Sequence, residues 1–152
     1  MSKLNQNEYF NFKSFSEFCF HKDELPPETR HTVEVLLDVS SNDYEEAERV
    51  LSNETVLDLE SCEITDLSPL ITLSNLTCLY LSENEISDLT PLQGITNLRR
   101  IELHKNKIID IRPLSKLINV EEIHLYKNKI SDIKPFLLKT FVLYAIDHQN
   151  FP

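Results

Sequence analysis

Apolar residues in the second half of the chain recur at one constant spacing. Four consecutive 22-residue copies of one phrase align without gaps, and they place Leu57, Leu79, Ile101 and Ile123 at equivalent positions. Apolar and polar residues alternate at the start of each copy, as in Leu79, Tyr80 and Leu81, which predicts a short strand that buries every other side chain. A strict repeat of this length is typical of a solenoid whose successive copies stack on one another.

An asparagine lies three residues after the second apolar position of the strand in the last three copies, at Asn84, Asn106 and Asn128. The chain must turn there, and its backbone donors and acceptors would otherwise be buried without partners. A carboxamide can both donate and accept hydrogen bonds. We therefore expect these side chains to form a ladder between adjacent coils, with Cys62 at the equivalent place in the first copy.

An aspartate and a proline then follow in every copy: Asp66, Asp88, Asp110 and Asp132, with Pro69, Pro91, Pro113 and Pro135. The proline suits the first position of a short helical turn. Ser68 and Thr90 are good N-caps for that turn, whereas Arg112 and Lys134 are poor ones, so capping is expected to weaken along the chain. The aspartates would lie near the exposed N–H groups of the turn, which favours a structural role for them.

Residues 1 to 54 lack the repeat and predict three short helices. Ser14 and Glu17 form a capping-box signature before Phe15, Phe18 and Cys19. Pro26 and Pro27 start a second helix, whose apolar face comprises Val33, Leu36, Leu37 and Val39. Asn42 and Glu45 start a third helix, which carries Ala47, Val50 and Leu51. Because a solenoid needs a cover over its first coil, we interpret this segment as a helical N-terminal cap, preceded by a flexible tail of the first 12 residues.

The motif LxxLxLxxN occurs from Leu76 to Asn84 and from Leu98 to Asn106, and with valine first from Val120 to Asn128. It resembles the motif of leucine-rich repeats. The repeat length and the phrases ITDLSPL, ISDLTPL, IIDIRPL and ISDIKPF are similar to the internalin and phosphatase-regulator type. The phrases PETRHTVEVLLDV and EEAERVLSNETVLDL also resemble the helical segment before internalin-like repeats of cyanobacterial proteins. The resemblance implies an α/β fold: a curved solenoid with parallel strands on its concave side and short helical turns on its convex side.

One further period would begin near Val142, and it departs from the pattern. Val142, Ala145 and Asn150 fit the expected positions, whereas Asp147 replaces an apolar residue. We predict a degenerate capping strand around Ala145 to Asp147, where the charge of Asp147 blunts the open edge of the sheet. Residues 55 to 152 would then hold four repeats and this strand.

The composition narrows the possible functions. The chain of 152 residues carries a net charge of -10, which disfavours nucleic acid as a partner. Its charge is uneven: residues 1 to 98 hold 19 acidic and five basic side chains, and the remainder holds six acidic and 10 basic ones. No signal peptide or membrane-spanning stretch is evident. Three cysteines, an odd number, favour reduced thiols in the cytoplasm and a protein without disulfides.

The outward positions of the four predicted strands define a candidate partner-binding surface, which we call the concave face. It comprises Val56, Asp58, Glu60, Cys78, Tyr80, Ser82, Arg100, Glu102, His104, Glu122, His124 and Tyr126. Adjacent strands are predicted to place Tyr80, Glu102 and His124 in one row, with Ser82, His104 and Tyr126 in the next. Tyrosine and arginine are enriched at binding hot spots. An alternative is that these positions need only be soluble.

Catalysis and metal binding are disfavoured. A shallow open face cannot enclose a substrate, and there is neither a glycine-rich phosphate loop nor a recognisable nucleophile arrangement. His104, His124, Glu102 and Cys78 could approach one another, but an open sheet would give such a metal site little support. The sequence therefore predicts a non-catalytic module without cofactors that binds a protein or peptide. Two alternatives are an enzyme regulator, such as a phosphatase subunit, and a self-associating structural module.

Overall fold

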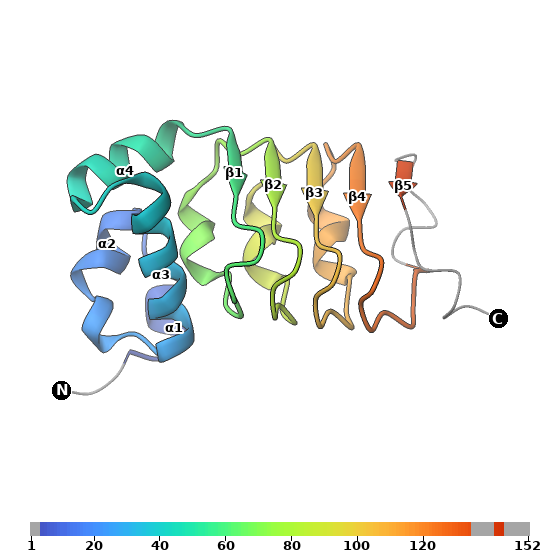
Figure 1. The fold of residues 1–152 in the computed structure, drawn as a ribbon, viewed down its shortest axis with the longest axis horizontal. Helices are drawn as coiled ribbons and strands as arrows, with labels where there is room; N and C mark the ends of the chain where they lie inside the picture. The colour runs from blue at the N-terminus through green and yellow to red at the C-terminus, as the bar shows by residue number, and fades with distance from the viewer. Residues whose placement is uncertain (1–3, 135–141, 145–152) are drawn as a thin grey trace.

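A computed structural model describes residues 4–134 and 142–144 of the chain. Helices form one end of the molecule, and a regular series of strand-containing coils extends away from them (Figure 1). This arrangement confirms the predicted α/β repeat fold. Within the described residues, no helix is both long and apolar enough to cross a membrane.

Five short parallel strands form one sheet in the order β1-β2-β3-β4-β5. Their bounds are β1 Val56–Asp58, β2 Cys78–Tyr80, β3 Arg100–Glu102, β4 Glu122–His124 and β5 Val142–Tyr144. Leu57 pairs with Leu79, Leu79 with Ile101 and Ile101 with Ile123, so the first four strands keep the 22-residue register of the sequence. Each of these central residues is buried, and both neighbours in its strand are at least partly exposed.

The fifth strand lies earlier than the sequence predicts. Leu143 pairs with Ile123, only 20 positions before it in the chain. The structure describes β5 at Val142–Tyr144, and the predicted residues 145 to 147 lie outside the described part of the chain. Extrapolation of the 22-residue period did not predict this register, which is two positions shorter.

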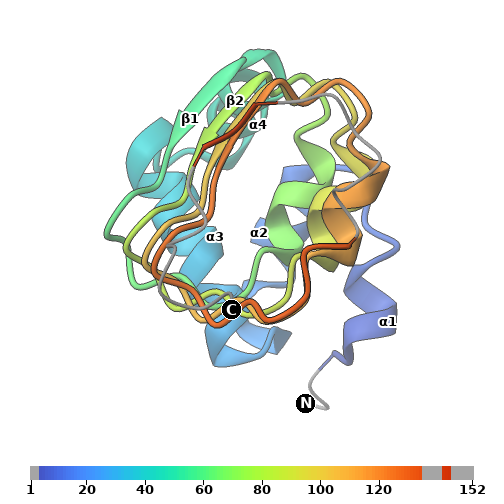
Figure 2. The same cartoon turned by 90° about the vertical axis from the view of Figure 1, so that its right-hand side faces the viewer.

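Three 3₁₀ helices lie across the solenoid from the sheet: η2 Ser68–Thr72, η3 Thr90–Gly94 and η4 Arg112–Lys116. Viewed down the solenoid axis, they stack behind one another on the side opposite the strands (Figure 2). The space between is filled by apolar columns that are almost fully buried, including Leu59, Leu81 and Leu103 from the sheet side and Leu70, Leu92 and Leu114 from the helices. Full burial of one leucine contributes roughly 1.5 to 3 kcal/mol, so each added coil strengthens one continuous core.

The predicted asparagine ladder is confirmed. The Asn84 side-chain oxygen accepts hydrogen bonds from the backbone N–H groups of Cys62 and Ile64, at 3.1 and 2.9 Å. Its nitrogen donates to the carbonyl oxygens of Leu59 and Leu81, at 2.8 and 3.0 Å. One and two coils further on, Asn106 and Asn128 accept from the N–H groups of Ile86 and Ile108, and each donates to two backbone carbonyls in the same way. Each carboxamide therefore satisfies buried backbone groups in its own coil and in the preceding one.

The prediction that capping weakens along the chain is wrong. The Oδ1 atom of each aspartate accepts a hydrogen bond from the backbone N–H two residues later, on Ser68, Thr90, Arg112 and Lys134, at 2.8 to 2.9 Å. Ser68, Thr90 and Arg112 are the first residues of their 3₁₀ helices rather than the N-caps. The aspartate side chain satisfies the first N–H of each of these helices, and the same bond recurs at Asp132. The structural interpretation of the aspartates is confirmed.

The N-terminal helices are α1 Gln6–Tyr9, α2 Phe15–Phe20, α3 Pro27–Ser40 and α4 Tyr44–Asn53, with a 3₁₀ turn η1 at Lys22–Glu24. Ser14 caps α2 as predicted, since its hydroxyl accepts from the N–H of Glu17. Helix α4 begins one residue later than expected: Asp43, not Asn42, accepts from the N–H of Glu46 at 2.9 Å. Val39 is half exposed and does not belong to the buried face of α3.

Hydrogen bonds join this helical segment to the first coil. Thr29 on α3 donates to the Asp66 carboxylate at 2.5 Å, and Thr32 donates to the Asp66 carbonyl at 2.7 Å. The His31 ring bonds the carbonyl of Cys62 at 2.8 Å. Helices α2 and α3 also contact η2. These contacts satisfy polar groups at the end of the solenoid that no preceding coil could satisfy.

In residues 4–12 of the predicted flexible tail, the apolar side chains pack against the helices, whereas residues 5–8 are exposed. Leu4 donates a backbone hydrogen bond to Glu24, and Tyr9 is buried. The Phe12 ring lies edge-on to Phe18, with centroids 4.9 Å apart. The aromatic residues of this segment therefore extend the core, a role that its polar composition concealed.

Candidate partner-binding face

The register of the sheet sets the concave face in rows. One row runs across the four strands: Asp58 pairs with Tyr80, Tyr80 with Glu102, and Glu102 with His124. The row before it joins Val56, Cys78, Arg100 and Glu122. Parallel pairing thus brings together residues that are 22 positions apart, and the predicted row of Tyr80, Glu102 and His124 is confirmed.

Arg100 is the centre of a charged network on this face. Its guanidinium donates to Glu102 at 2.8 Å and to Glu122 at 3.0 Å. The hydrogen bond with Glu102 raises the pKa of Arg100, which keeps the guanidinium charged. The same group lies 5.9 Å from the centre of the Tyr80 ring, within cation–π distance. These contacts hold long side chains in one arrangement.

The network continues to His124, whose Nε2 lies 2.7 Å from Glu122. Glu102 and Glu122 are largely covered, with side chains 16% and 27% exposed. The carboxylates therefore serve mainly to orient Arg100 and His124.

Ser82 and His104 differ from the prediction that all twelve residues reach solvent. Ser82 is fully buried and His104 is only 8% exposed. The Ser82 hydroxyl lies 2.6 Å from His104 Nδ1, and the His104 ring stacks on Tyr126 with centroids 4.4 Å apart. Because serine is small, the imidazole of His104 can lie close to the sheet and is buried there. Tyr126 is half-buried and is the more exposed residue of this row.

The first strand forms an acidic flank, as predicted. Val56, Asp58 and Glu60 are all exposed. The concave face as a whole has the carboxylates Asp58, Glu60, Glu102 and Glu122 against the single cation Arg100. With neutral histidines its net charge is therefore negative, and a basic surface would complement it.

The metal-ligand group considered from sequence does not match the one that the fold brings together. Among the described residues, potential ligand atoms of Glu60, Glu83 and His104 lie within 4.8 Å of one another. The side-chain hydrogen bond from Lys105 lowers the pKa of Glu83 and occupies that carboxylate. This competing cation, and the exposure of both glutamates, make the group a poor metal site.

The loop beyond the strands carries charged residues that the strand pattern did not predict as contacts. Lys105 pairs with Glu83, and Lys107 pairs with Glu85 at 3.0 Å. Each pair joins residues 22 positions apart. Glutamates in one copy are followed by lysines at the equivalent positions of the next copy, and this reversal of charge could have predicted these contacts.

Comparisons with known proteins agree with this geometry. A family model for leucine-rich repeats matches residues 55–94 and 96–138, more than half of the chain. The chain belongs to the leucine-rich repeat family. Comparison with curated proteins found no significant match.

Two similar solved structures are internalins of Listeria monocytogenes. Internalin C2 shares 31% identity with a TM-score of 0.55, over 64% of this chain and 54% of the internalin chain. The internalin InlF shares 26% identity with a TM-score of 0.52, over 69% of this chain and 38% of the InlF chain. This leucine-rich repeat protein thus has internalin-type repeats, and it spans about half or less of the length of these two proteins.

Proposed function

We propose that this leucine-rich repeat protein binds a protein or peptide partner through its concave face. The observation that carries the proposal is the order of that face: Arg100, Glu102, Glu122 and His124 form one connected network. Side chains that are already fixed lose little conformational entropy on binding. Tyr80 and Tyr126 add partly exposed aromatic area of the kind enriched at hot spots.

The partner would present basic groups to the acidic flank. Asp58 and Glu60 are exposed, and neither forms a salt bridge among those found within the described residues. Such groups steer association through long-range attraction more than they add affinity. Binding should therefore weaken as salt is raised.

The module is proposed to be non-catalytic and to act in a reducing compartment such as the cytoplasm. An open sheet surface cannot exclude water from a reacting group, and all three thiols are free. In this proposal residues 1 to 54 form a cap that supports the repeats of residues 55 to 152.

The test compares proteins captured by three forms of the chain from a lysate of its source. The first is wild type, and the second carries Tyr80→Ala, Arg100→Ala and Tyr126→Ala. The third carries Gln93→Ala and Lys116→Ala on η3 and η4, across the solenoid from the sheet. The proposal requires one partner that the second form loses and the third keeps. Retention of all captured proteins by the second form would refute it.

A further inference from the structure

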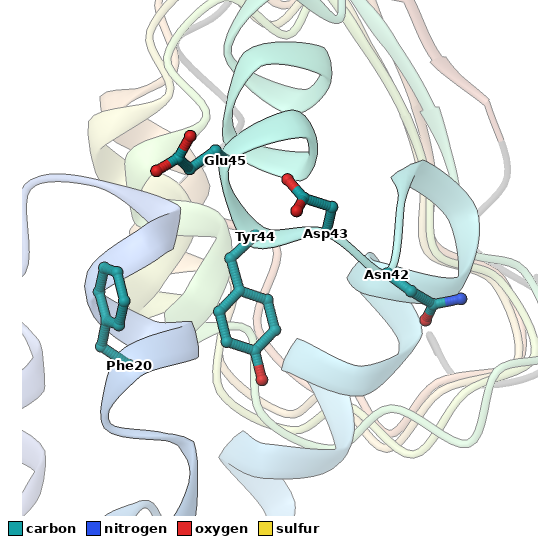
Figure 3. Close-up of a pocket in the computed structure, with 5 residues that line it drawn as sticks. All are labelled: Phe20, Asn42, Asp43, Tyr44 and Glu45. Carbon is teal, nitrogen blue, oxygen red and sulfur yellow. The ribbon is translucent and has the colours of Figure 1, made fainter.

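We propose that the N-terminal cap has its own site for an arginine side chain of a partner polypeptide, against the adjoining rings of Phe20 and Tyr44. These residues line a shallow, open surface pocket of about 310 Å³ together with Asn42, Asp43 and Glu45. The pocket lies between the end of α2 and the start of α4 (Figure 3). Its volume is at the lower limit of small-molecule pockets, so it suits a single side chain.

The two aromatic rings form adjoining walls. Their centroids lie 6.3 Å apart and their planes are perpendicular. Phe20 is 71% exposed although it ends a helix whose other phenylalanines are fully buried. A ligand that covered this ring would remove apolar area from water, which would favour binding.

The charge around the pocket selects a cation. Glu45 is exposed, and in Figure 3 its carboxylate lies above the two rings. The basic residue one turn along, Arg49, pairs with Glu46 at 2.5 Å, which leaves Glu45 without a basic partner in the described part of the chain. Residues 1 to 54 hold 12 acidic and five basic side chains, so the surrounding field also attracts positive charge.

The start of α4 would by itself favour an anion, since its dipole is equivalent to about half a positive charge. Asp43 and Glu45 bring two negative charges to the same place, and Asp43 already caps the helix by accepting from the N–H of Glu46. The carboxylates outweigh the dipole, so the pocket favours a cationic ligand over an anionic one.

Arginine fits this combination better than lysine does. A planar guanidinium can stack on one aromatic face while its edge donates two hydrogen bonds to a carboxylate. Lysine offers a compact, strongly hydrated charge that cannot stack in this way. The site would therefore recognise arginine through Phe20, Tyr44 and Glu45, and it is separate from the concave face.

The experiment titrates the isotope-labelled full chain with the blocked peptide Gly-Gly-Arg-Gly-Gly and follows NMR signals of the Phe20 and Tyr44 rings. The same peptide with citrulline is the neutral isostere, and a lysine version tests the preference for guanidinium. Each peptide is also compared with free arginine amide to separate a polypeptide source from a free ligand. We expect arginine to shift both rings, lysine to bind more weakly, and citrulline to leave the signals in place.

Two variants and a matched control decide the outcome. Glu45→Gln and Phe20→Leu should each weaken binding of the arginine peptide by about three-fold or more, the scale of one exposed ion pair or cation–π contact. Glu28→Gln changes an exposed glutamate in the first turn of α3 that does not line this pocket, and should have no effect. Equal shifts with citrulline, or unchanged affinity of Glu45→Gln, would overturn the proposal. Neither result bears on the concave face, because no concave-face residue takes part.

Discussion

The His104 imidazole stacks on the Tyr126 ring with a centroid distance of 4.4 Å and planes 9° from parallel. The two residues are 22 positions apart and meet because β3 and β4 pair in parallel. Ser82, in the coil before His104, fixes the imidazole because its hydroxyl lies 2.6 Å from Nδ1. One side of the concave face is therefore a rigid aromatic unit rather than a row of independent side chains.

A double-mutant cycle should detect this unit. The variants His104→Ala, Tyr126→Ala and their combination should give a coupling energy of about 0.5 to 1.5 kcal/mol in urea unfolding, the range for stacked aromatic pairs. A second cycle between Tyr80 and Tyr126, which lie two strands apart, should give a value near zero. Equal coupling in the two cycles would mean that the stack adds no stability.

The asparagine ladder predicts a large cost for one side chain. Asn84→Ala removes a carboxamide that bonds the backbone of Cys62, Ile64, Leu59 and Leu81. Buried groups left without partners cost about 1 to 3 kcal/mol each. We expect a loss of at least about 3 kcal/mol in the free energy of unfolding.

The matched control for the ladder is Asn97→Ala. Asn97 is exposed and makes a hydrogen bond to the Ser74 carbonyl at 2.9 Å, where water can replace it. Its loss should cost less than about 1 kcal/mol. If both variants unfold at the same urea concentration, the ladder does not stabilise the solenoid as described.

The repeat made much of this fold predictable. Strand, asparagine and aspartate positions follow from the physical demands of one coil, and the same demands recur in every copy. Leu79 and Leu81 are buried because successive side chains of a strand point to opposite faces, and these two leucines share the face that packs on the core. The cap was less predictable, because Asn42 and Asp43 are both suitable N-caps and only the packing of α4 against α2 and α3 selects the second.

The concave face was predictable in position but not in detail. Side-chain orientation there depends on contacts across strands, which single copies do not reveal. His104 is covered because the equivalent residue one strand before it is the small Ser82. The exposure of Phe20 could not be predicted from the sequence either, since Phe20 continues the apolar run of Phe15, Phe18 and Cys19.

The junction between cap and repeats should depend on Thr29. Its hydroxyl donates to the Asp66 carboxylate at 2.5 Å, and the side chain is buried. Thr29→Val keeps the shape but removes the donor, which should cost about 1.5 to 3 kcal/mol because the acceptor is charged. Hydrogen exchange should also speed up in α3, since its contact with the first coil is weakened.

Thr72→Val is the control for this junction. The Thr72 hydroxyl donates to the Pro69 carbonyl, at 3.3 Å within the same 3₁₀ helix, and its replacement should cost less than about 1 kcal/mol. Equal stability of the two variants, with unchanged exchange in α3, would show that the bond between Thr29 and the Asp66 carboxylate does not anchor the cap.

The Cys19 thiol should make the protein sensitive to alkaline pH. Burial, with a smaller contribution from Glu48, raises the pKa of Cys19 to about 11, whereas an unfolded cysteine titrates near about 8.5. The thiol therefore contributes stability that is fully present below about pH 8.5 and is lost as the pH rises toward 11. Urea unfolding of wild type and Cys19→Ala should show that wild type loses more stability than the variant between about pH 7 and about pH 10.

In the folded protein a thiol reagent should modify the half-exposed Cys62 and Cys78 first, and Cys19 only at the rate of unfolding. Equal modification of all three thiols in the folded state, or parallel pH profiles for the two proteins, would contradict the burial of Cys19 in a closed cap.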